Sequence, residues 1–262
     1  MAGPKRSKAS LRRIDFKILI CQILLGLALI GLWEWAGRSF GHAWTSLPSL
    51  IFERLIVWVQ TTLARHIAVT LMEIGIGLMI GVTAGVALGL ILGRSFVLGI
   101  VFRPIIVGFY SVPVVTMAPL LILWFGLDLM PKIVLVTISA FFLLFFNTFA
   151  GVQAIDRDLI LSMRLMGSSR GEEFRKVVAP GAMTWIVSGV KIALPYAFAA
   201  AVTGELLAAR EGMGSLISKA AAQFDMTGLY AALLVLMVMG VIASGLMVAA
   251  ERWLLRWRHA AG

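Results

Sequence analysis

One pentapeptide of the chain has the letters of a catalytic motif. The residues Gly167-Ser168-Ser169-Arg170-Gly171 match G-x-S-x-G, the turn that presents the nucleophile of many serine hydrolases. That turn needs a strand before it, a helix after it, and a base beside the serine. Here the preceding residues have a helical pattern, and none of the three histidines falls where it could serve the serine. We therefore predict no catalytic residue and no enzymatic activity for this chain.

Nucleotide and metal chemistry are also missing from the pattern. The chain has no G-x-x-x-x-G-K-[ST] segment to cradle phosphates and no H-E-x-x-H helix to bind zinc. Its one cysteine, Cys21, lies inside an apolar run, which argues against a disulfide or a thiolate site. We expect no cofactor and no metal on this chain, so energy for work against a gradient must come from another subunit or from an ion.

The pentapeptide lies in a polar segment, residues 152–187, of an otherwise apolar chain. At about 3 kcal/mol for each central charge, burying this segment in hydrocarbon would cost about 25 kcal/mol. The segment is therefore expected to be a loop outside the bilayer. It has nine charged residues: Asp156, Arg157, Asp158, Arg164, Arg170, Glu172, Glu173, Arg175 and Lys176.

The loop has the signals of two short helices rather than of a passive linker. Asp158 can cap a first helix over residues 159–166, and Gly167 fits the left-handed position at its end. Ser169 and Glu172 have the spacing of a capping box. A second helix is expected to start there and to end near Val178, with Pro180 just past its end.

The predicted product is a helix-glycine-helix knob beside a basic rim, shaped to fit a groove of a partner. Its apolar side chains are expected to be Ile160, Met163, Met166 and Phe174.

Composition identifies the remainder as an integral membrane protein. Hydrophobic residues make up 60% of the 262 residues, and apolar runs of about 20 residues recur. The sequence predicts an all-α, polytopic fold with about six transmembrane helices. The predicted spans are 17–37, 66–93, 103–124, 131–151, 188–208 and 229–251.

The basic residues fix the expected orientation. The net charge of +10 could suggest nucleic acid, but the basic residues flank membrane spans, where the positive-inside rule accounts for them. With the N-terminus in the cytoplasm, seventeen of the 23 Lys and Arg residues face inward. We therefore expect cytoplasmic tails at 1–16 and 252–262, an extracytoplasmic segment at 38–65, and a core domain at 66–251 whose loop 152–187 is cytoplasmic.

Two spans have unusual small or helix-breaking residues. Five glycines in the second span, from Gly77 to Gly93, recur at four-residue spacing and form a groove for close helix packing. We expect that packing to lie within one subunit, with a sliding or dimer contact as the alternative. The third span contains Pro104, Pro113 and Pro119, and Ser111 to Pro113 is a candidate for the transport pathway or for a structural kink.

Few ionisable residues fall inside the spans. The main ones are Glu73 and Glu205, with Asn147 as a polar companion. Membrane carboxylates are often functional, so Glu205 and Asn147 join Ser111 and Pro113 as candidates for the translocation path. The alternative is a structural hydrogen bond or salt bridge. Both glutamates lie near helix ends, where we expect water to reach them.

The polar loop resembles the EAA loop of membrane-spanning subunits of binding-protein-dependent ABC importers. In that family a glycine follows an E-A-A triplet after three residues, and an I-x-L-P segment follows after nine more. Gly167 and residues 177–180 reproduce this spacing. The triplet position instead reads Leu161-Ser162-Met163, so the helix is kept and the acidic residue is lost.

Further segments resemble the nitrate, sulfonate and taurine branch of this family, over about residues 45 to 258. Their order and spacing carry the resemblance more than any single match. They are Leu47-Pro48-Ser49, the P-L-x-I-x-W-F-G stretch at 119–126, the N-T-x-x-G segment at 147–151, Gly204-Glu205-Leu206-Leu207, and Gly212-Met213-Gly214.

The resemblance implies a permease of the type I importer (MetI-like) fold in a bacterial inner membrane. It implies a homodimer, two copies of an ABC ATPase that bind ATP and magnesium, and an extracytoplasmic solute-binding protein. A small anion such as an aliphatic sulfonate, taurine or nitrate is the expected solute, with a neutral or heterocyclic vitamin precursor as the alternative. The loop residues expected to contact the ATPase are Met163, Met166, Gly167, Ser169, Arg170, Glu172, Phe174 and Pro180.

An ion-driven secondary transporter is the competing class. Such a protein is expected to show inverted repeats and several buried ionisable residues. The sequence shows neither feature.

Overall fold

The computed structural model describes residues 8–41, 45–208 and 210–255, and this part of the chain is helical without strands. Five helices are long and apolar enough to cross a membrane, and one bent pair of helices makes a sixth candidate span. The predicted all-α fold with about six transmembrane helices is therefore confirmed.

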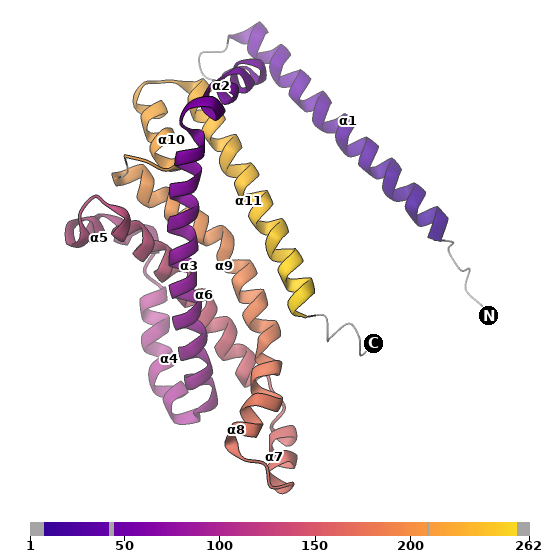
Figure 1. Cartoon of the computed structure of the whole chain (residues 1–262), viewed down its shortest axis with the longest axis vertical. Helices are drawn as coiled ribbons and strands as arrows, with labels where there is room; N and C mark the ends of the chain where they lie inside the picture. Colours follow the sequence, from indigo (N-terminus) through magenta and orange to yellow (C-terminus); the bar gives the residue numbers. More distant parts are fainter. Residues whose placement is uncertain (1–7, 42–44, 209, 256–262) are drawn as a thin grey trace.

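The helices run in an order that alternates long spans with short connecting elements (Figure 1). Two short elements, η1 and η2, are a 3₁₀ turn and a π turn. The bounds are α1 Lys8–Phe40, α2 Pro48–Thr61, α3 Leu63–Arg94, α4 Phe96–Tyr110, η1 Val114–Met117, α5 Ala118–Phe125, α6 Leu129–Gln153, α7 Arg157–Leu165, α8 Arg170–Glu173, η2 Phe174–Val178, α9 Ala179–Ala208, α10 Met213–Ala222 and α11 Met226–Leu254.

The glycines of α3 lie against α6 of the same chain. A Cβ atom added at Gly81 would lie 2.6 Å from the Thr137 carbonyl oxygen, and one at Gly85 would lie 2.6 Å from that of Phe141. Real side-chain atoms do not approach this closely, so only glycine allows the two backbones to meet here. The expected packing within one subunit is confirmed. The alternative dimer contact on this face is wrong, because α6 fills the groove.

The predicted third span is broken. Its two parts, Val97–Tyr110 and Val114–Phe125, are bent by 74°. Pro113 lies at the bend, whereas Pro104 is accommodated inside α4 and Pro119 lies in the first turn of α5. The ring of Tyr110 packs on those of Phe142 and Phe146, near the middle of α6. The break therefore lies near half the depth of the helix bundle.

The helices α2, α10, α7 and α8 lie at the two opposite ends of the bundle, whereas α5 projects from its side (Figure 1). α2 and α10 lie at one end, where Arg54 of α2 forms a 2.7 Å ion pair with Asp225, the N-cap of α11. α7 and α8 project from the other end. α1 stands away from the core, and only 6% of its most apolar stretch, within Ile20–Ser39, is buried.

Candidate functional site

The first helix of the projecting loop, α7, has a different cap from the one predicted. Asp156, in an extended conformation, accepts a 2.9 Å hydrogen bond from the Asp158 amide and is the N-cap. The predicted cap, Asp158, instead lies in the first turn, where its charge still suits the positive end of the helix. Both aspartates satisfy simple rules for a helix start, and the helix begins two residues earlier than expected.

Gly167 forms the turn between the two helices, as predicted. Its φ of +82° lies in the left-handed region that glycine tolerates best. The Ser168 amide donates to the Met163 carbonyl at 3.1 Å, and the Gly167 amide donates to the Arg164 carbonyl at 2.9 Å. These bonds satisfy the last carbonyls of α7 and reverse the chain direction within a few residues.

The capping box of α8 is confirmed. The Ser169 hydroxyl accepts from the Glu172 amide at 3.3 Å, and the Glu172 carboxylate accepts from the Ser169 amide at 3.0 Å. Glu172 also forms a 2.9 Å ion pair with Lys176. The hydrogen bond from the Ser169 backbone, helped by Lys176, lowers the pKa of Glu172 to about 2.

This lowered pKa makes the turn acid-sensitive. A carboxylate whose pKa falls on folding stabilises the fold above its unfolded pKa and loses that effect as pH falls towards the folded value. We therefore expect the protection of the Glu172 amide from hydrogen exchange to decrease as pH falls from about 4.5 to about 2. Glu172→Gln keeps the box but lacks the charge, so its protection factor should not follow pH in this range. Equal losses in both proteins would contradict this role of the carboxylate.

The second helix does not stop at Pro180, so that expectation is wrong. α8 continues through η2 into α9, and Arg170–Ala208 forms one helix of 39 residues. The Ala179 amide donates to the Phe174 carbonyl, five residues back, as in a π turn. Proline has no amide hydrogen to donate, and the wider π turn just before Pro180 accommodates it, so the helix continues. The charged stretch up to Lys176 extends this helix beyond its apolar part.

Two contacts hold the loop in place. The Arg164 guanidinium binds the buried Glu173 carboxylate through two hydrogen bonds, of 2.8 and 3.1 Å, and joins α7 to α8. This bond lowers the pKa of Glu173. Arg94, at the end of α3, lies 5.1 Å from the centre of the Phe174 ring and reaches the Arg170 carbonyl. The loop is therefore attached to α3 as well as to α9.

The exposed apolar surface of the loop differs from the predicted one. Ile160, Met163 and Phe174 are half-buried, whereas Met166 is 87% exposed. Leu165, which the sequence reasoning missed, is 82% exposed, and Leu159 and Leu161 are also exposed. Its exposure could have been predicted from the sequence, because Leu165 lies at the end of the helix, two residues before the turn at Gly167. Ser169, Arg170 and Glu172 lie exposed beside this tip.

The four predicted path residues do not share a site within one chain. Ser111 and Pro113 lie exposed at the break, where the Ser111 hydroxyl donates to the Val107 carbonyl at 2.9 Å. Asn147 is half-buried at the α6–α9 contact beside Gly189 and donates to the Leu143 carbonyl at 2.8 Å. Glu205 is fully buried near the end of α9.

Glu205 belongs to a buried polar cluster at the end of the bundle opposite the loop. It accepts 2.6 Å hydrogen bonds from the Thr70 hydroxyl and from the Gly214 amide. Nearby, Glu73 forms a 2.5 Å ion pair with Lys132, and both side chains are buried. The expectation that water reaches the two glutamates is therefore wrong, because both are fully buried. Their contacts are those of the structural alternative, a hydrogen bond and a salt bridge, and the role of Glu205 in a path stays a prediction.

The positive-inside count placed Lys132 among the six basic residues outside the membrane. Its neighbours in the sequence do not indicate the contact with Glu73, which lies on another predicted span. Among the described residues, no group of three or more His, Cys, Asp or Glu could hold a metal ion.

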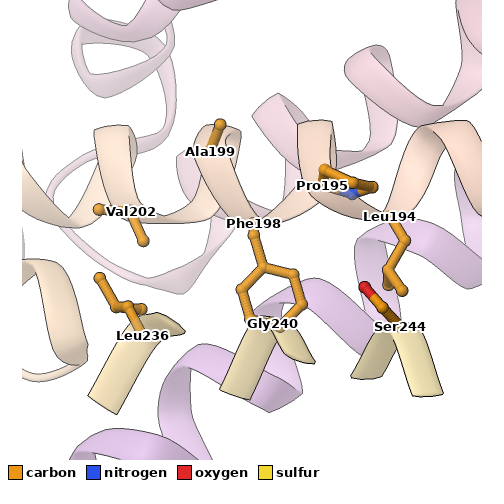
Figure 2. Close-up of a pocket in the computed structure, with 8 residues that line it drawn as sticks. All are labelled: Leu194, Pro195, Phe198, Ala199, Val202, Leu236, Gly240 and Ser244. Atoms are coloured by element: carbon orange, nitrogen blue, oxygen red, sulfur yellow. The ribbon is translucent and has the colours of Figure 1, made fainter. Parts of the chain in front are cut away.

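A groove lies between α9 and α11 (Figure 2). Its volume is about 320 Å³, and Ser244 is the one lining residue with a polar side chain. None of the four predicted path residues lines it. The lining residues are Leu194, Pro195, Phe198, Ala199, Val202, Leu236, Gly240 and Ser244.

The described residues form a polytopic helical bundle with a polar helix-turn-helix loop at one end. The chain belongs to the family described as binding-protein-dependent transport system inner membrane component, which it matches over residues 81–256. It is therefore a non-catalytic permease component of an ABC importer, a class that works with a separate ATPase subunit and a solute-binding protein.

Two relatives and one solved structure agree with this assignment. The formylaminopyrimidine transport permease protein ThiX of Halalkalibacterium halodurans is 29% identical over 90% of this chain and 94% of its own. The putative aliphatic sulfonates transport permease protein SsuC of Bacillus subtilis is 29% identical over 90% of this chain and 87% of its own. An inward-facing structure of the MetNI methionine ABC transporter is 23% identical, and the match covers 74% of this chain and 94% of that one with a TM-score of 0.60. This likeness shows the MetI-like fold.

Proposed function

We propose that two copies of this chain form the translocation path and that each loop docks into one of two ATPase subunits. The observation that carries this proposal is the loop tip, where Leu165 and Met166 are almost fully exposed on a turn fixed by Gly167. An apolar tip that faces water outside the membrane, beside charged side chains, is suited to bind a groove in a partner protein.

The helix that follows the loop supports a mechanical coupling. Because Arg170–Ala208 is one continuous helix, a displacement of its first turn is transmitted to the membrane part of α9. Arg94 adds a second connection, to α3. The close glycine contacts of α3 with α6 then allow packed helices to rock as units during alternating access.

The broken span supports the homodimer. Irregular backbone at membrane depth is tolerated where protein covers it or where it lines a water-filled cavity, because lipid cannot satisfy its polar groups. Ser111, Pro113 and Val115 at the break are exposed in the single chain. A second copy facing the break would cover part of it and enclose the rest as a path.

For the solute, we propose a small anion, with an aliphatic sulfonate, taurine or nitrate as first candidates. The similarity to SsuC over most of both chains supports this class. A heterocyclic vitamin precursor is the second candidate, which the equal similarity to ThiX supports. Residues 104–125, which contain the break, have no charged side chain, and this favours the heterocyclic candidate over an anion.

Uptake competition separates these two candidates. Membrane vesicles with the complete importer should accumulate labelled taurine or an alkanesulfonate, and excess unlabelled formylaminopyrimidine should not compete. Competition by formylaminopyrimidine, without any by sulfonates, would favour the second candidate and would leave the permease assignment intact.

The orientation follows from the same proposal, with both termini and the loop in the cytoplasm of a bacterial cell and α2 and α10 at the outer face. In a Cys21→Ala background, a cysteine at the exposed position Arg170 should react with an impermeant thiol reagent only after the cells are permeabilised. A cysteine at exposed Leu127, in the turn before α6, should react in intact cells. Labelling of the Arg170→Cys protein in intact cells would contradict the proposed orientation.

A further inference from the structure

The buried cluster at the outer end has an uneven count of charges. Glu73 and Glu205 are both 0% exposed, and among the described residues Lys132 is the one buried lysine or arginine. The cluster joins four helices, since Glu73 comes from α3, Lys132 from α6 and Glu205 from α9, with the start of α10 completing it. With both carboxylates ionised, it would carry a net negative charge in a fully buried site.

The two carboxyl groups belong to one connected set of buried contacts. Thr70, one turn before Glu73 on α3, donates to Glu205, and Lys132, the ion-pair partner of Glu73, packs against Gly204, the residue before Glu205. Two ionised carboxylates have no hydrogen to share, so a hydrogen bond between them requires a proton on one of them. Like charges held close together in a low-dielectric site also favour a state in which the pair holds a single proton.

Hydrogen bonds assign the charge within the pair. Glu205 receives the Thr70 hydroxyl on one oxygen and the Gly214 amide on the other, at the N-terminus of the ten-residue α10. These donors and the helix dipole favour its ionised form. Glu73 has Lys132 beside Oε1, but neither Glu73 oxygen receives a hydrogen bond from the described residues. Oε2 is therefore the oxygen free to carry the proton.

Other titratable groups around the pair are either remote or neutralised in the described residues. His66 of α3 is engaged through Nδ1 with the Gly212 backbone. Arg65 is paired with Glu211 at the surface, and Lys219 of α10 donates to the Arg210 carbonyl. None of these contacts supplies a second buried cation to the carboxyl pair.

We propose that Glu73 and Glu205 form a proton-binding pair that holds one shared proton while α3, α6, α9 and α10 are packed together. Glu73 carries the proton on Oε2 and donates it to Glu205, while Oε1 stays beside Lys132. The cluster is then neutral, and Oε2 of Glu73 has a partner. Because the packed state binds one more proton than a state with both carboxylates in water, lower pH favours the packed state.

Infrared spectroscopy of the purified protein tests this proposal directly. At neutral pH the wild-type protein should show the C=O stretching band of a protonated carboxylic acid, with the shift expected on transfer to heavy water. Both Glu73→Gln and Glu205→Gln should abolish the band, because either substitution leaves one carboxylate neutralised by Lys132. Glu53→Gln, at an exposed position of α2, should leave the band unchanged.

The outcomes separate sharing from simple burial. Absence of the band in the wild type would overturn the proposal without any variant. Survival of the band in Glu205→Gln would show a carboxyl group protonated on its own, and would also overturn it. As a second readout, the melting temperature of the wild type should fall relative to that of Glu73→Gln as pH rises, and parallel curves would contradict the shared proton.

Discussion

Replacing Gly85 with alanine is expected to destabilise the helix bundle by about 1–3 kcal/mol, the usual range for overpacking. The new Cβ would lie 2.6 Å from the Phe141 carbonyl oxygen and 2.9 Å from the Leu144 Cβ. Backbone of α6 cannot rotate away as a flexible side chain could, so the two helices must separate. Thermal unfolding in detergent should show a lower melting temperature, and a leucine at the same position should prevent stable folding.

Gly75 offers a matched control on the same helix. A Cβ added there meets nothing within 4 Å. Gly75→Ala should leave the melting temperature unchanged or raise it slightly, because alanine favours helix by up to about 1 kcal/mol over glycine. If Gly85→Ala and Gly75→Ala behave alike, the close approach of α3 to α6 is not a determinant of the fold.

Replacing Gly167 with valine is expected to uncouple ATP hydrolysis from transport. The left-handed backbone at this position costs a residue with a Cβ about 1–2 kcal/mol, and more when that residue is β-branched. The equilibrium between the turn that places Leu165 and Met166 and other conformations of the loop would then shift against that turn by a factor of about 5–30. Uptake per ATP hydrolysed, measured with the partner ATPase in proteoliposomes, should fall by a similar factor.

The control for this substitution lies four residues away. Gly171 has helical backbone, and an added Cβ would meet only the Ser169 hydroxyl oxygen, at 3.9 Å. Gly171→Ala should therefore keep wild-type coupling. Normal coupling in Gly167→Val would show that the left-handed turn does not set the position of the tip.

Local signals in the loop were sufficient to predict its turns. The capping box at Ser169 and the left-handed glycine at 167 depend on neighbours within a few residues, so sequence spacing defines them. The predicted stop at Pro180 was wrong because proline ends a helix only when nothing accommodates its missing amide, and here a π turn does. The wrong cap, Asp158 for Asp156, is an error of two residues at a helix end.

Contacts between distant segments were much less predictable. Hydropathy gave the spans, but the bend of 74° at Pro113 depends on how α5 packs against α6 and α9 and how α4 packs against α6. The burial of Lys132 beside Glu73 joins residues about sixty positions apart, and charge counting assigned that lysine to the outer surface. The roles of Ser111, Pro113, Asn147 and Glu205 in a path stay predictions, because a path between two copies is not visible in one chain.

Reconstitution of the complete importer tests the central claim most directly. The chain, its ATPase and its solute-binding protein would be placed in proteoliposomes and solute uptake measured. We predict uptake only when ATP is present on the side of the loop and the binding protein is present on the opposite side. Uptake by the chain alone, driven by an ion gradient without ATP, would contradict the account and identify a secondary transporter.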